Sequence, residues 1–103
     1  MKKLKILVLD SSPIIYIGLK SIFKNSLVFE VSDYAETDEN ICEILNHAEI
    51  NLIVSDVYYK KGSASSLLKK FKKNKIEIPI IIFTSVSNES KSIDLLKSGA
   101  SGF

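Results

Sequence analysis

Short apolar runs alternate along the chain with longer stretches in which apolar residues recur at helical spacing. Four runs rich in β-branched and aliphatic residues predict strands at Leu4–Leu9, Val28–Ser32, Asn51–Ser55 and Ile78–Thr84. The stretches that follow them predict helices. Their apolar positions are Ile14, Ile17, Leu19, Ile22 and Phe23; Ile41, Ile44 and Leu45; Leu67, Leu68 and Phe71; and Ile93 and Leu96. This alternation is typical of a doubly wound α/β fold, a parallel sheet with helices on both faces.

Residues that begin and end helices agree with these boundaries. Ser12-Pro13 predicts an N-cap followed by a proline at the first helical position. Thr37, Ser63 and Ser87 are suited to cap the later helices, and Gly99 to end the fourth.

The apolar content of each strand predicts its place in the sheet. The first (LKILVL), third (NLIVS) and fourth (IPIIIFT) are nearly continuous apolar runs, as expected of strands covered on both faces. The second (VFEVS) alternates between apolar and polar residues, which suits an edge. We therefore expect the order second, first, third, fourth, which is the flavodoxin-like order 2-1-3-4(-5).

That order leaves the fourth strand, Ile80-Ile81-Ile82-Phe83, as a bare apolar edge, which native proteins usually cover. The chain ends at Gly102-Phe103, where a further strand would begin. We expect residues 1–103 to form one domain whose fifth strand and last helix are missing or incomplete, or whose edge a second molecule covers. A natural four-stranded protein is the alternative.

Polar residues at the strand ends mark a candidate site. In open α/β sheets, ligands bind beyond the carboxyl ends of the strands, where the winding reverses. Here the reversal falls between the first and third strands, which end in Asp10 and Asp56, and the adjacent fourth strand ends in Thr84. Two close carboxylates repel each other, and Mg²⁺ with its oxygen ligands is the natural compensation. Either aspartate alone could instead cap the helix or turn that follows it.

Composition narrows the range of partners and compartments. A net charge of +2 is too small to indicate nucleic acid or a membrane as a direct partner, and no apolar run approaches the length of a membrane span. The single cysteine, Cys42, cannot form a disulfide within the chain, which favours a reducing cytoplasm. Because it lies in an apolar helical stripe, we expect it to be buried.

Four segments together resemble the receiver domains of response regulators, over the whole length of the chain. Residues 7–13 (Leu-Val-Leu-Asp-Ser-Ser-Pro) resemble the first-strand motif, LIVSD the third strand ending in the phosphorylated aspartate, and IIFTS the fourth strand with its hydroxyl. KSGASGF is similar to the segment before the fifth strand. Residues 10–13 and the GASGF segment are most similar to the branch that carries a LuxR/NarL-type DNA-binding domain, which is absent from these 103 residues.

The resemblance implies a cytoplasmic signalling domain rather than an enzyme in the usual sense. A histidine kinase or phosphotransfer protein would transfer a phosphoryl group to Asp56, and the output would be transcription through the absent DNA-binding domain. A second copy of the chain is a further candidate partner. In such domains Mg²⁺ is bound at the acceptor, and the resemblance assigns the ligands to Asp10, Asp56, the backbone carbonyl of Tyr58 and the position of Ser11. Thr84 would bond the phosphate, and Phe103 would turn inward as the switch.

Four positions depart from the family pattern. Ser11 replaces the second acidic residue, and an uncharged hydroxyl is a poorer Mg²⁺ ligand, so we predict weakened metal binding and slow or absent phosphorylation. Tyr59-Lys60 replaces the usual Met-Pro, and Ala64 a usual glycine. Ser11 and Tyr59-Lys60 favour an alternative, a phosphorylation-independent pseudo-receiver that serves as an interaction or dimerisation module.

Two further functions on a similar sheet are disfavoured. A flavodoxin-like cofactor carrier needs a glycine in the turn after the first strand, and the turn that begins at Asp10 has none. An aspartate-nucleophile phosphatase needs a second carboxylate two residues after the first, and position 12 is serine.

Overall fold

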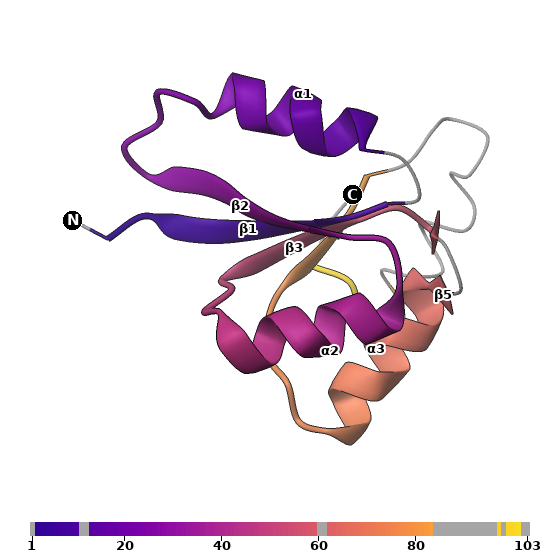
Figure 1. Ribbon diagram of the computed structural model, residues 1–103. Coiled ribbons are helices and arrows are strands. Elements are labelled where there is room, and N and C mark those ends of the chain that lie inside the picture. The colour runs from indigo at the N-terminus through magenta and orange to yellow at the C-terminus, as the bar shows by residue number, and fades with distance from the viewer. Residues whose placement is uncertain (1, 11–12, 60–61, 84–96, 98, 102–103) are drawn as a thin grey trace.

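The computed structural model describes residues 2–10, 13–59, 62–83, 97 and 99–101 (Figure 1). Within this part, the elements in chain order are β1 Leu4–Leu9, α1 Ile14–Ile22, β2 Phe29–Ala35, α2 Asp38–His47, β3 Leu52–Ser55, β4 Tyr58–Tyr59, β5 Gly62–Ser63, α3 Ala64–Lys73 and β6 Ile80–Ile82. None of the described helices has the length and apolar character needed to cross a membrane.

The main sheet is parallel and has the order β2-β1-β3-β6. Helix α1 covers one face, and α2 and α3 cover the other (Figure 1). The predicted doubly wound fold and the edge position of the second strand are therefore confirmed.

The core lies on both faces of the central strands, because successive side chains of a strand point to opposite sides. In β1, Leu7 and Leu9 belong to the larger cluster under α2 and α3, whereas Ile6 and Val8 belong to the smaller cluster under α1. This two-sided burial explains why β1 is an almost unbroken apolar run.

Helix α1 is apolar around most of its circumference, and the predicted stripe is wrong for three of its five positions. Ile14, Ile17 and Ile22 are 73%, 61% and 73% exposed. The residues that pack on the sheet are Ile15, Tyr16, Leu19 and Phe23. Only one side of the helix faces the sheet, and apolar residues occur on both sides, so the sequence did not distinguish them.

The second strand is longer than predicted and runs to Ala35 instead of ending at Ser32. The register with β1 shifts between Val31, opposite Ile6, and Asp33, opposite Leu7, so Ser32 is an extra residue in the strand. After such a bulge, the side chains that point into the core are shifted by one residue along the strand. Ala35 therefore lies in the larger core cluster. Because the bulge interrupts the alternation of apolar and polar residues at Ser32, the sequence pattern placed the end of the strand three residues too early.

The fourth predicted strand is shorter in the structure, where β6 covers Ile80–Ile82, and Thr84 lies outside the described residues. The outer edge of β6 is partly covered, which corrects the prediction of a bare edge. The Ser101 N–H donates to the carbonyl of Ile80 at 2.7 Å, and Ala100 is buried in the larger cluster. One backbone bond from Ser101 and the buried Ala100 therefore cover part of this edge.

Two predicted helix caps are confirmed. The Thr37 hydroxyl accepts from the Asn40 N–H at 3.1 Å, and Ser63 forms a reciprocal capping box with Ser66. The expected proline position is wrong, because Pro13 is itself the N-cap of α1 and Ile14 is the first helical residue. Ser12 and Ser87 lie outside the described residues. Gly99 has a φ of 121°, which only glycine adopts readily.

Cys42 is exposed, which corrects the prediction that it is buried. Its neighbour Ile41 is fully buried, and Ile44 and Leu45 pack against the same core. A position next to the inward residue is turned by about 100° around the helix, so the Cys42 side chain faces solvent.

Candidate functional site

Asp10 and Asp56 follow directly after the neighbouring strands β1 and β3. The Asp10 N–H donates to the Ala35 carbonyl at 3.1 Å, and the Asp56 N–H donates to the Leu9 carbonyl at 3.0 Å. These two bonds continue the sheet ladder by one residue on each strand. The ladder thereby holds both aspartates at the same edge, where the sheet changes its direction of winding.

The Asp56 carboxylate is partly buried and lies within the electrostatic influence of Asp10. Burial raises the pKa of Asp56, and the negative charge of Asp10 raises it further, while a hydrogen bond from the Val57 N–H opposes both effects. That bond joins the Val57 nitrogen to Asp56 Oδ1 at 2.7 Å. Asp10 is also buried. The edge of the sheet thus concentrates negative charge where water solvates it poorly.

This arrangement predicts a pH dependence of stability. The folded-state pKa of Asp56 is above its ordinary value of 3.8, so the folded protein binds more protons between these two values and loses stability as the pH rises through them. Asp56→Asn retains an oxygen for the Val57 N–H but removes the charge. We expect the variant to gain stability over the native protein as the pH rises from about 3 to about 7. Urea unfolding followed by circular dichroism across this range measures the difference, and a difference that does not change with pH would contradict the assignment.

Two carboxylates that repel each other at a partly buried edge fit the oxygen-ligand chemistry of a divalent cation. The fit is partial. Within residues 2–10, 13–59, 62–83, 97 and 99–101, no group of three or more His, Cys, Asp and Glu side chains could hold a metal ion.

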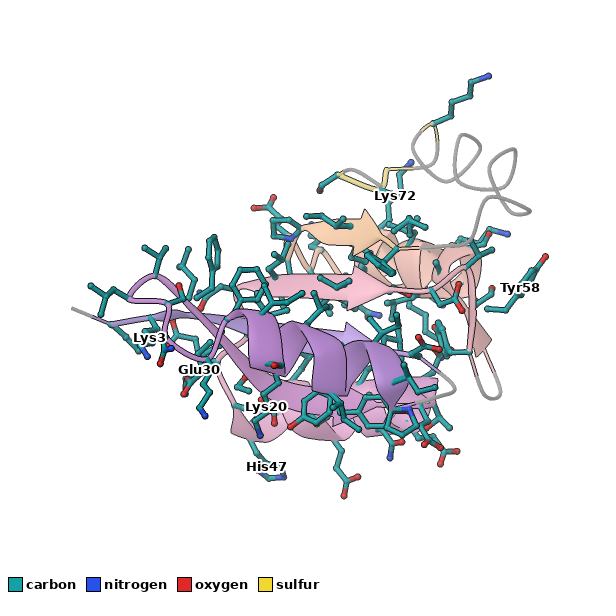
Figure 2. All side chains as sticks on the ribbon, turned by 90° about the horizontal axis from the view of Figure 1, so that it is seen from above. Lys3, Lys20, Glu30, His47, Tyr58 and Lys72 are labelled. Carbon is teal, nitrogen blue, oxygen red and sulfur yellow. The ribbon has the colours of Figure 1, made fainter. Side chains whose placement is uncertain are left out.

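The other predicted site residues lie partly inside and partly outside the described chain. Tyr58 begins β4, two residues after Asp56, and pairs with Ser63 of β5. Figure 2 shows Tyr58 beyond the carboxyl ends of the strands, with its side chain directed away from the sheet. Ser11, Thr84 and Phe103 lie outside the described residues, so their roles stay predictions.

Tyr34 has a contact with the site that sequence reasoning missed. Its ring is half-buried beside that of Tyr16, with centroids 5.3 Å apart. Its hydroxyl lies 3.1 Å from the Asp10 carbonyl and 3.2 Å from a Glu36 carboxylate oxygen. Burial, the bond to Glu36 and the charges of Glu36 and Asp10 raise the pKa of Tyr34 to about 12. It therefore remains a donor that helps to fix the backbone at Asp10. A half-buried tyrosine needs a partner for its hydroxyl, and this was the available signal.

Ser55 is a second missed residue. It is the only polar side chain in β3 and is completely buried, and its hydroxyl donates to the Asp56 carbonyl at 2.7 Å. A lone serine in an apolar strand is the signal that could have indicated it, because a buried hydroxyl must find an acceptor.

The sequence also identifies the family of this domain. The sequence model of the response regulator receiver domain matches residues 6–103. The chain belongs to this family. Receiver domains are phospho-accepting modules of two-component signalling systems and are not classical enzymes.

Individual relatives of this receiver domain are distant in sequence. Transcriptional regulatory protein YdfI of Bacillus subtilis (strain 168) is 25% identical over 99 residues, which covers 96% of this chain and 46% of that protein. The chain thus spans about half the length of that relative.

Solved structures agree with the fold. The receiver domain of the Francisella response regulator 1452 is 26% identical with a TM-score of 0.79, over 96% of this chain and 80% of that one. The N-terminal signal receiver domain of a response regulator from Bacteroides fragilis has a TM-score of 0.85 at 17% identity, over 99% of this chain and 83% of that one, and it supports the fold alone.

Proposed function

We propose that this receiver domain accepts a phosphoryl group on Asp56 from the phosphohistidine of a histidine kinase or phosphotransfer protein. The observation that carries the proposal is the placement of Asp10 and Asp56 at one edge of the sheet, close enough for the charge of Asp10 to raise the pKa of Asp56. A structural cap would not need a second carboxylate in this position.

The proposed transfer uses Asp56 as a nucleophile. A carboxylate oxygen of Asp56 forms a bond to phosphorus while the phosphorus–nitrogen bond to the histidine breaks, and the electron pair of that bond stays on the ring nitrogen. The Val57 N–H, bonded to Oδ1, orients the carboxylate and favours its charged form. The Ser55 hydroxyl and the Leu9 carbonyl hold the backbone on either side of this nucleophile.

Asp10, Asp56, the Tyr58 carbonyl and, weakly, Ser11 would hold Mg²⁺. When bound, Mg²⁺ neutralises charge on the phosphoryl oxygens and between the carboxylates. We assign the Thr84 hydroxyl to bond a phosphate oxygen and Phe103 to the switch that follows. The output proposed is transcription through a DNA-binding domain outside this chain, which the similarity to YdfI, a transcriptional regulatory protein, supports. Cys42 as the only cysteine supports a cytoplasmic location.

Treatment with Mg²⁺ and acetyl phosphate tests the proposal. We expect a single phosphoryl adduct by intact-protein mass spectrometry, assigned to Asp56 after fragmentation. Beryllofluoride should shift the amide resonances of Asp56 and Val57 in NMR spectra. Absence of both signals at saturating Mg²⁺ would overturn phosphoryl acceptance.

The second candidate is the phosphorylation-independent pseudo-receiver, in which the same fold acts as an interaction or dimerisation module. Ser11 favours it, as does the lack of a third acidic side chain at the described part of the site. Under this function the adduct would be absent, and sedimentation would show the same assembly with and without acetyl phosphate.

Restoring the acidic pair tests whether position 11 belongs to the proposed metal site. We expect Ser11→Asp to bind Mg²⁺ about tenfold more tightly than the native chain, because a charged oxygen ligand replaces a neutral one. Titration followed by NMR gives both dissociation constants. Ser11→Asn is the matched control, since its oxygen is similarly placed but uncharged. Equal affinities in all three proteins would show that position 11 does not contact the metal.

A further inference from the structure

Tyr59 is buried in the acceptor loop, by which we mean the described residues 57–59 and 62–63 that follow Asp56. Its side chain is 6% exposed, next to the exposed Tyr58. The Tyr59 hydroxyl donates to the carboxylate of Asp38, and the Ser63 carbonyl is a second acceptor at 2.9 Å. Burial and the negative Asp38 raise the pKa of Tyr59 above its ordinary value of 10, so the hydroxyl keeps its proton. Tyr59 therefore joins the loop to helix α2.

Asp38 extends this connection to a third element. It lies in the first turn of α2, where a negative charge is favourable, and its other oxygen accepts from Lys70 Nζ of α3 at 3.1 Å. The Asp38 side chain is only 15% exposed, so both bonds form in a partly desolvated setting. The carboxylate thus joins the acceptor loop, α2 and α3 at one point.

The backbone of the loop fits closely around this point. A Cβ atom added to Gly62 would lie 2.5 Å from Tyr59 Cε2 and 3.0 Å from Asp38 Oδ1. Contacts this short would require a shift of the tyrosine ring, so β5 can approach Tyr59 only because position 62 is glycine. The loop is closed at its base by the Ala64 N–H, which donates to the Val57 carbonyl at 2.9 Å.

We propose that Tyr59, Asp38 and Lys70 form a positioning cluster that fixes the acceptor loop beside Asp56. The backbone of Tyr58 is held between Val57, whose N–H bonds the Asp56 carboxylate, and the anchored Tyr59. Where the family resemblance expects Met-Pro, this chain has Tyr59-Lys60 and lacks the backbone restraint of a proline. The hydroxyl network supplies that restraint instead. The effect of the cluster on the metal rests on the proposed function, whereas its effect on the loop does not.

Tyr59→Phe tests the cluster, since it removes one oxygen and keeps the ring. We expect the Ala64 amide to exchange its hydrogen about tenfold faster, and the dissociation constant for Mg²⁺ to rise about fivefold, which is the loss of roughly one hydrogen bond. Tyr16→Phe is the matched control, because the Tyr16 hydroxyl accepts from Lys20 within α1, on the opposite face of the sheet from α2 and α3 (Figure 1). It should change neither quantity.

Two further measurements separate local positioning from general destabilisation. The Ile53 N–H donates to the Pro79 carbonyl in the central sheet, so its hydrogen exchange reports global unfolding. In Tyr59→Phe its exchange rate should change only as far as the free energy of unfolding changes. Asp38→Asn should loosen the loop less than Tyr59→Phe, because an amide oxygen still accepts.

The outcomes distinguish the cluster from the proposed function. If exchange at Ala64 and Mg²⁺ affinity are both unchanged in Tyr59→Phe, the cluster is overturned. If exchange accelerates but the native chain forms no phosphoryl adduct, the cluster stands as a holder of the loop and the phospho-acceptor function fails.

Discussion

Asp56→Asn is expected to reduce phosphoryl labelling by acetyl phosphate at least about 100-fold, because an amide lacks the anionic oxygen that attacks phosphorus. The backbone at this position is held by bonds that do not involve the carboxylate, from the Asp56 N–H to Leu9 and from Ser55 to the Asp56 carbonyl. The variant should therefore fold normally. Intact-protein mass spectrometry after a fixed incubation with Mg²⁺ measures the labelled fraction.

Asp33→Asn is the control for this experiment. Asp33 is a half-buried aspartate of β2 whose carboxylate accepts from the neighbouring Ser32 hydroxyl, so it tests whether any partly buried aspartate is labelled. We expect its labelling to equal that of the native chain. If Asp56→Asn were labelled at the native rate, the acceptor would be a different residue and the proposed function would need a different site.

Ile53→Ala should lower the free energy of unfolding by about 3 kcal/mol, the usual range for removing a fully buried aliphatic side chain. Ile53 is 0% exposed and lies in the central strand β3, within the cluster under α2 and α3. A domain of this size has a total stability of about 5–15 kcal/mol, so the loss is a large fraction of it. Urea unfolding monitored by circular dichroism gives the value.

Ile17→Ala is the matched comparison, since the same side chain is removed from a site that is 61% exposed on the outer side of α1. Its cost should stay below about 0.5 kcal/mol. A loss comparable to that of Ile53→Ala would mean that the outer side of α1 is covered in solution.

The sequence was sufficient to predict the architecture because the apolar content of each strand depends on how many of its faces are buried. Strands covered on both faces, such as β1, need apolar residues at every position, and the alternating β2 can lie only at an edge. Thr37 and Ser63 could be recognised as caps for a similar reason, since capping is a local bond between a hydroxyl and a nearby N–H.

Features that depend on neighbours distant in sequence were not predictable. The side of α1 that packs on the sheet could not be chosen, because isoleucines lie on both sides. The extension of β2 to Ala35 depends on the bulge at Ser32, which the strand forms only against β1. The β4–β5 hairpin was missed because each of its strands is two residues long and because it is stabilised by the bond of Tyr59 to Asp38, which is 21 residues earlier in the chain.

For the site, the sequence by itself determined that Asp10 and Asp56 share one edge of the sheet, because each follows a strand and parallel strands end on the same side. Only the tertiary structure decided the surroundings of these carboxylates. Burial at the sheet edge, the Tyr34 contact to the Asp10 backbone and the Tyr59–Asp38–Lys70 cluster all join residues far apart in the chain. Solvation and hydrogen bonding depend on distances in space, and a linear pattern does not contain those distances until the chain has folded.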